Sequence, residues 1–219
     1  MQAPERTRTM RVTMLLAVWL WVHGAAAAPR GLEGQLRTGD IVLHTSRSRQ
    51  SKLIQAATES PLSHMGLVEV TPQGVWVVEA VQPVQRVAFA KWKARGVEGR
   101  ILVLRPQGLS DARRGQALAR AKAHLGKPYD WRFGWDDEAL YCSELVRKAY
   151  AQGAGVEYGK MERLGSLKVR GLEKPMRERY GGKVPLELEL VTPASIAVDA
   201  RLDVVHSDFP SVRQDGTGR

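Results

Sequence analysis

The stretch that decides the fold is residues 64–81, which read HMGLVEVTPQGVWVVEAV. Residues 64–70 and 75–81 are two apolar, β-branched runs, and the turn residues Thr71-Pro72-Gln73-Gly74 lie between them. Two such runs around a Pro/Gly turn are typical of a β-hairpin. We therefore predict two antiparallel strands joined at this turn.

The length of the loop sets the register of this hairpin. With a two- or four-residue loop centred on Pro72 and Gln73, the numbers of paired residues sum to 145, so Gly66 faces Glu79. His64 and Glu79 are then diagonal neighbours on one face, with Cβ atoms roughly 5–8 Å apart, and Gly66 leaves room between them. An odd loop length would place them on opposite faces. An imidazole beside a carboxylate is the second half of a Cys-His-acid triad.

The rest of the chain predicts both strands and helices. Further strands are expected at residues 41–44, 101–104 and 184–191, and helices at residues 48–58, 110–125, 142–152 and from Thr192-Pro193 onward. The strands and helices do not alternate as βαβ units. This order favours an α+β fold in which an antiparallel sheet packs against helices.

Cys142 is the only cysteine of the 219 residues, which excludes an intramolecular disulfide. It lies at the start of the helix predicted for residues 142–152, which we expect Gly153 to end. A helix N-terminus favours a thiolate, and the Cys142 backbone N–H could contribute to an oxyanion hole. The alternative is a buried small hydrophobic residue, with His64 as an ordinary hydrogen-bonded strand histidine.

The N-terminus has the pattern of an export signal. Arg6, Arg8 and Arg11 precede an uncharged run at residues 12–22, and small residues follow at 24–28. The run is about half the roughly 20 apolar residues of a membrane span. We therefore expect residues 1–27 to be a signal peptide and the mature protein to be periplasmic or envelope-associated; an uncleaved signal anchor is the alternative.

The chain is basic, with a formal net charge of +10, and its hydrophobic content of 43% is ordinary for a folded protein. Residues 160–183 hold eight Lys or Arg against three Glu. This basic segment could attract anionic lipid headgroups or acidic wall polymers, or it could be a solvated surface. Nucleic acid is a poorer partner, because no aromatic platform is interleaved with the basic residues.

Five motifs occur in an order that resembles a known family: Gly39-Asp40-Ile41-Val42, residues 57–66 (ATESPLSHMG), Val78-Glu79-Ala80, residues 126–130 (GKPYD) and residues 140–146 (LYCSELV). They resemble the YiiX-like (YebB-like) branch of the NlpC-type cysteine hydrolases, which have a circularly permuted papain-like fold. The resemblance covers about residues 36–205. It implies a hydrolase domain at 36–208, after a lead-in at 28–35 and before a flexible tail at 209–219.

The resemblance also implies the roles of individual residues. Cys142 would be the nucleophile, His64 the general base and then acid, and Glu79 the residue that orients His64. Tyr129 and Tyr141 match positions that line the substrate cleft, where either side chain could instead serve in aromatic packing. No cofactor is implied, and the lone cysteine and the absence of a helical His-x-x-x-His pattern argue against a zinc site.

The expected activity is that of an exported amidase or peptidase. Cys142 would attack an amide or ester to give a thioester acyl-enzyme, and the substrate would be a cell-envelope peptide or an acyl lipid. Two alternatives remain open: a catalytically inactive envelope-binding module, and an acyltransferase or thioesterase on the same fold.

Overall fold

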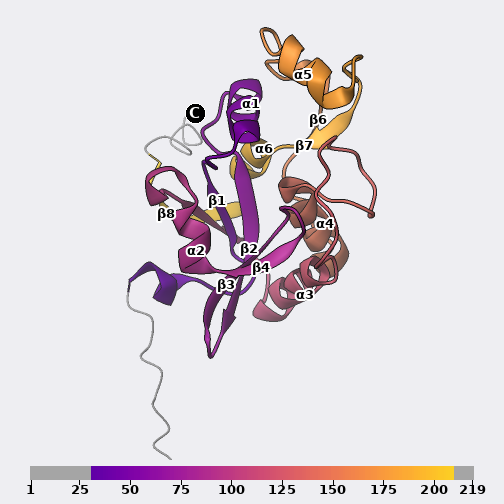
Figure 1. Ribbon diagram of the computed structural model, residues 1–219. Helices are drawn as coiled ribbons and strands as arrows, with labels where there is room; N and C mark the ends of the chain where they lie inside the picture. Colours follow the sequence, from indigo (N-terminus) through magenta and orange to yellow (C-terminus); the bar gives the residue numbers. More distant parts are fainter. Residues whose placement is uncertain (1–30, 210–219) are drawn as a thin grey trace, which may run out of the picture.

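The computed structural model describes residues 31–209, and its centre is a six-stranded antiparallel sheet (Figure 1). The strands lie in the order β4-β3-β2-β1-β5-β8. Their bounds are β1 Ile41–His44, β2 His64–Thr71, β3 Gly74–Glu79, β4 Gln85–Ala88, β5 Leu102–Pro106 and β8 Leu202–Ser207. The predicted α+β fold with an antiparallel sheet packed against helices is confirmed.

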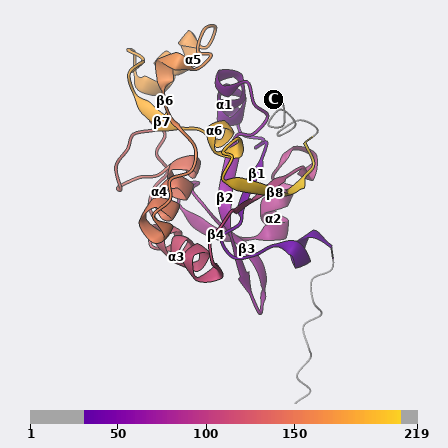
Figure 2. The same cartoon turned by 180° about the vertical axis from the view of Figure 1, so that it is seen from behind.

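Apolar residues cover both faces of this sheet. Along β1, Ile41 and Leu43 contact one cluster of buried side chains, and Val42 contacts the other, because successive side chains of a strand point to opposite faces. Helices α3 and α4 cover the larger cluster, and the short helix α2 covers the smaller one, as Figures 1 and 2 show from opposite sides. The helices are α1 Arg49–Thr58, α2 Phe89–Ala94, α3 Asp111–Lys122, α4 Cys142–Ala154, α5 Glu173–Tyr180 and α6 Pro193–Ala197.

The hairpin has the predicted register. Strand β2 pairs with β3 from Leu67 opposite Val78 to Thr71 opposite Gly74, so paired numbers sum to 145. Pro72 and Gln73 form the two-residue loop. An added side chain at Gly66 would lie 2.5 Å from Val77 Cγ1 and 3.3 Å from Glu79 Cβ, so a glycine is needed at this crossing.

Helix α4 is longer than predicted, because Gly153 does not end it. The helix ends at Ala154, and Gly155 adopts the left-handed conformation (φ 62°) of a C-cap. A Cβ atom on Gly153 would lie 2.6 Å from backbone atoms of Ala117 in α3. Gly153 therefore allows α3 and α4 to pack closely.

A small second layer forms from residues 160–191. It contains the two-stranded pair β6 (Met161–Arg163) and β7 (Glu189–Val191), together with α5, and it lies at the same end of the sheet as α1 (Figure 1). The strand predicted at 184–191 was wrong over most of its length. Its partner β6 has three residues, and Pro185 has no N–H to donate to a ladder.

The described chain stays packed to its last residue. Phe209, which we had placed in the tail, is buried in the larger cluster, so the packed domain extends one residue beyond the predicted boundary. The predicted signal peptide, the first residues of the lead-in and the rest of the tail lie outside the described residues. No helix within residues 31–209 is long and apolar enough to cross a membrane.

Candidate active site

His64 and Glu79 meet on one face of the sheet, as the register requires. His64 is the first residue of β2, and Glu79 is the last residue of β3. His64 Nε2 lies 2.7 Å from Glu79 Oε2, and the Glu79 side chain is completely buried. This contact fixes the ring orientation of His64 and leaves its other nitrogen, Nδ1, for a second partner.

Two further residues hold Glu79, and the sequence did not reveal them. Gln85 Nε2 donates a hydrogen bond of 2.8 Å to Glu79 Oε1, and Arg95 Nη2 donates to the same oxygen. Burial alone would raise the pKa of Glu79, but the hydrogen bond and charge of His64, together with the hydrogen bonds from Arg95 and Gln85, lower it to about 2. Glu79 is therefore ionised at any pH above that value.

Cys142 is the second partner of His64. It is the first residue of α4, only 2% of its surface is exposed, and it lies close enough to the imidazole to affect the pKa of His64. Burial alone would lower the pKa of His64, but the interactions with Cys142 and Glu79 outweigh it and raise the pKa to about 9. At neutral pH the ring is thus an imidazolium between two acidic groups.

The start of α4 is held by side chains that flank Cys142. The Tyr141 N–H donates to Glu144 Oε2 at 3.2 Å, and Glu144 pairs with Lys148 at 2.8 Å. Ser143 Oγ donates to the backbone oxygen of Val191 at 2.8 Å. Burial, opposed by Lys148, raises the pKa of Glu144 to about 7. These contacts give Glu144 a structural role at the helix start.

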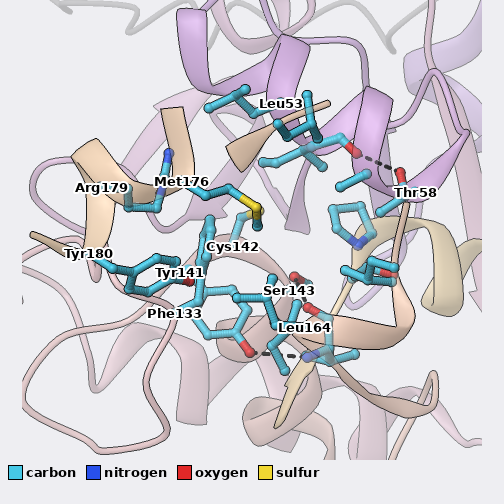
Figure 3. Close-up of a pocket in the computed structure, with 18 residues that line it drawn as sticks. Leu53, Thr58, Phe133, Tyr141, Cys142, Ser143, Leu164, Met176, Arg179 and Tyr180 are labelled. Carbon is cyan, nitrogen blue, oxygen red and sulfur yellow. Dashed lines mark hydrogen bonds between the residues drawn. The ribbon is translucent and has the colours of Figure 1, made fainter. Parts of the chain in front are cut away.

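An apolar slot opens beside Cys142, and Figure 3 shows its lining. Its walls come from α1, from the start of α4 and from the 160–191 layer. The side chains that narrow it are Leu53, Phe133, Leu164, Leu172, Met176 and Tyr180. Arg179 is the only charged residue of the lining, so the slot suits an uncharged, apolar group.

A separate polar cleft opens on the His64 side. It has a volume of about 370 Å³, and Ile54 of α1 lines both this cleft and the apolar slot. Its polar lining includes Ser46, Ser48, Arg49, Gln50, Gln82 and Arg95. Cys142 and His64 therefore lie where two chemically different cavities meet.

The two tyrosines lie in different cavities. Tyr141 lines the apolar slot, and its hydroxyl accepts a hydrogen bond of 3.1 Å from the Val191 N–H, so that oxygen anchors β7. Tyr129 lines the polar cleft, and its hydroxyl accepts a hydrogen bond of 2.9 Å from Gln50 Nε2. Burial raises the pKa of Tyr129 well above its usual value, so the phenol stays neutral.

His44 supports His64 from the neighbouring strand. The two residues pair across β1 and β2, and the His44 ring stacks on Trp92 with centroids 4.2 Å apart. Burial and the charge of His64 lower the pKa of His44 to about 3, so it stays neutral. Within residues 31–209, no three His, Cys, Asp or Glu side chains cluster as the ligands of a metal ion would.

Comparison with known proteins identifies the family. Residues 35–206 match the model of the permuted papain-like amidases of the YaeF/YiiX, C92 family. The chain is 37% identical over 179 residues to the uncharacterized protein YiiX of Escherichia coli strain K12, covering 80% of this chain and 89% of that protein. The crystal structure of the metalloprotein YiiX from Escherichia coli O157:H7 superposes with a TM-score of 0.77 at 37% identity, covering 80% of this chain and 99% of that one. The protein therefore belongs to the YaeF/YiiX family of permuted papain-like amidases.

Proposed function

We propose that the protein is an exported cysteine amidase of the cell envelope, with Cys142 as nucleophile, His64 as base and acid, and Glu79 as the residue that orients His64. One observation carries this proposal: His64 interacts with Glu79 and with Cys142 at the same time. A buried histidine between a carboxylate and a thiol is the arrangement that activates a cysteine nucleophile.

The reaction would proceed through a thioester. The Cys142 sulfur attacks the carbonyl carbon, and the negative charge that develops on the carbonyl oxygen is stabilised by N–H groups at the start of α4, which have no partners within the helix. The imidazolium of His64 then protonates the leaving nitrogen as the C–N bond breaks. Neutral His64 next takes a proton from water as the water oxygen attacks the thioester carbonyl. The C–S bond then breaks, the carboxylic acid leaves, and the Cys142 thiolate is restored beside the imidazolium of His64.

The apolar slot supports an acyl lipid over a peptide as the source of the acyl group. In the acyl-enzyme the acyl group is bonded to Cys142, so it must occupy the cavity that this side chain lines. Leucine, phenylalanine and methionine side chains offer few hydrogen bonds to the amide groups of a peptide, whereas an alkyl chain needs none. An aliphatic acyl group is therefore the substrate that the slot favours.

The proposed mechanism includes no metal. The E. coli relative is described as a metalloprotein. In the part of this chain that the structure describes, the donor residues do not form a cluster of three. His64 already interacts with both Cys142 and Glu79, and the proposed steps use only these three side chains.

The envelope location rests on the N-terminal sequence and on the basic segment. The Arg-rich start, apolar run and small residues within residues 1–28 support export. Helix α5 belongs to the basic segment 160–183, and its residues Met176, Arg179 and Tyr180 line the slot. Attraction of this segment to anionic lipids would bring the slot to the surface from which an acyl substrate comes.

Acyl transfer to Cys142 tests the proposed function. Purified protein is incubated with p-nitrophenyl dodecanoate or p-nitrophenyl acetate, and the intact mass of the protein is measured. We expect a dodecanoyl adduct that forms at least tenfold faster than the acetyl adduct and that is absent in Cys142→Ala. Absence of any adduct in the wild-type protein would favour the inactive binding module.

A second variant tests the slot. Ala57 is buried and lines the slot, so Ala57→Phe should fill part of it and slow dodecanoyl transfer relative to acetyl transfer by about tenfold. Ala119→Phe, on the exposed side of α3, is the matched control and should keep the wild-type ratio. Equal ratios in the two variants would contradict the assignment of the slot to the acyl group.

A further inference from the structure

We propose that the polar cleft beside His64 binds an anionic group on the leaving amine through Arg49 and Arg95, so that the protein prefers acyl amides whose amine carries a carboxylate or phosphate. This inference rests on the proposed function, because that function decides which part of the substrate enters which cavity. It adds the chemical class of the leaving group.

The positions of Cys142 and His64 divide the substrate between the two cavities. The acyl group stays on Cys142 and therefore occupies the apolar slot. The leaving nitrogen receives its proton from His64, which lines the polar cleft. The amine part of the substrate therefore lies in the polar cleft at the moment when the C–N bond breaks.

The charged side chains that line this cleft are all positive. Arg49 and Arg95 line it, and no aspartate or glutamate does. Arg49 is exposed and forms no ion pair with any residue in the range 31–209 that the structure describes. An unpaired guanidinium at the rim of a cleft is suited to a carboxylate or phosphate, because its N–H groups match two oxygens of either anion.

Arg95 also lines the cleft, and it comes from the end of α2, whereas Arg49 comes from the start of α1. The Arg95 guanidinium donates to the buried Glu79 while 42% of its side chain remains exposed. Arg95 shares the carboxylate of Glu79 with His64. Because 42% of the Arg95 side chain is exposed and it lines the same cleft as Arg49, the two residues can share an incoming anion.

Neutral groups complete the cleft. Gln50 and Tyr129 are hydrogen-bonded to each other, and Gln82 Oε1 accepts a hydrogen bond of 2.6 Å from the Tyr129 N–H. These side chains are already paired, so they shape the wall without competing for the anion. Helix α1 begins at Arg49, and the field of its N-terminus also favours a negative group here.

Turnover of matched substrates tests the inference. N-Dodecanoylglycine is compared with N-dodecanoylglycinamide, which lacks the carboxylate, and N-dodecanoyl-O-phosphoethanolamine with N-dodecanoylethanolamine. We expect kcat/KM to be at least tenfold higher for one or both anionic members, because a hydrogen bond between a guanidinium and an anion is stronger than one between neutral groups. The two pairs distinguish a carboxylate from a phosphate. Equal kcat/KM within both pairs would overturn the inference.

Matched variants assign the preference to Arg49. Arg49→Gln should lower the ratio of anionic to neutral kcat/KM by about tenfold. Arg47→Gln makes the same charge change two residues away, at a position that does not line the cleft, and should keep the wild-type ratio. The same ratio in both variants would contradict the assignment.

A binding measurement separates this inference from the proposed function. Calorimetric titration of Cys142→Ala with N-dodecanoylglycine and with its glycinamide needs no turnover. Tighter binding of the anionic compound, weakened by Arg49→Gln, supports the anion site even if no amide is hydrolysed. Hydrolysis without any preference in binding or rate would support the amidase and overturn the anion site.

Discussion

At the scale of single residues, the site depends on a carboxylate, Glu79, that three side chains keep in place and ionised. Burial works against the charge of Glu79, whereas His64, Arg95 and Gln85 favour it. The resulting negative charge in turn raises the pKa of His64. Glu79 therefore acts on Cys142 through the imidazole, so its removal should slow alkylation of Cys142 less than removal of His64 does.

The first prediction concerns this coupling. Glu79→Gln should lower the pKa of His64 from about 9 by one pH unit or more, which corresponds to about 1.4 kcal/mol, because the ring loses its carboxylate partner. NMR titration of the His64 ring protons measures the change, with His64→Ala identifying the signals. An unchanged pKa would show that Glu79 does not stabilise the imidazolium.

The directions of the pKa shifts of His64 and Glu79 decide at which pH each residue stabilises the folded protein. His64 has a raised pKa in the folded protein, so its interactions contribute fully below its ordinary value of about 6.5 and are lost as pH rises through about 9. Glu79 has a lowered pKa, so its contribution is present above about 4.5 and is lost as pH falls through about 2. Both contributions are substantially present between about pH 5 and 6.5.

Residue-level prediction from the sequence succeeded where a single geometric rule applied. The hairpin register placed His64 and Glu79 together, because a two-residue loop leaves no freedom in the pairing. Gln85 lies opposite Glu79 on β4, a strand we did not predict. Arg95 comes from the end of α2, and no local pattern links it to a carboxylate in the hairpin.

At the scale of elements, the close packing of α3 against α4 positions the nucleophile. Cys142 begins α4, and the other end of that helix is held against Ala117 of α3, where only a glycine fits. We predicted Gly153 as a helix end because glycine commonly follows the last helical turn. The close neighbour that explains its presence lies 36 positions away along the chain, beyond the reach of a local pattern.

The second prediction tests this packing. Gly153→Ala should lower the free energy of unfolding by about 1–3 kcal/mol, because its Cβ would lie 2.6 Å from the α3 backbone. Gly115→Ala, within α3 and with no atom within 4 Å of the added Cβ, should raise it by up to about 1 kcal/mol through helix propensity. Urea unfolding measures both, and equal effects would contradict the packing argument.

Helix α5, which lies in the basic segment 160–183, was not predicted from the sequence. Helix α5 is short and mostly polar, and Met176 is its one buried residue, which lines the slot and belongs to the larger core cluster. Pro175 lies within the first turn of the helix, where its missing N–H costs nothing. Sequence periodicity detects helices that have a continuous apolar face, and α5 has too few apolar residues to show one.

At the scale of the whole molecule, the sheet holds the histidine and its carboxylate, while α4 brings the thiol to them. The predicted antiparallel sheet and its helices are present, and the apolar residues of both faces are buried. The two cavities could not be predicted, since α1, α4 and the 160–191 layer approach each other only through the tertiary fold.

The third prediction concerns the basic segment. The protein should co-sediment with vesicles containing phosphatidylglycerol at low salt and should be released at about 0.5 M salt, because screening weakens surface attraction. Lys168→Glu with Lys174→Glu should weaken binding about tenfold or more. The control double variant, Lys91→Glu with Arg120→Glu, makes the same charge change on α2 and α3, outside the basic segment, and should weaken binding less. Equal losses in the two double variants would show that net charge alone attracts the membrane.

The most direct test of the account is the rate at which iodoacetamide alkylates Cys142, the only thiol of the chain, at pH 6 and pH 9. His64→Ala should slow alkylation by up to about 100-fold at pH 6, where an ordinary thiol is about 0.3% ionised, and only a few-fold at pH 9. His124→Ala, a buried histidine at the end of α3, is the control and should leave both rates unchanged. A wild-type rate that follows an ordinary thiol titration and does not change in His64→Ala would contradict the Cys142–His64 pair.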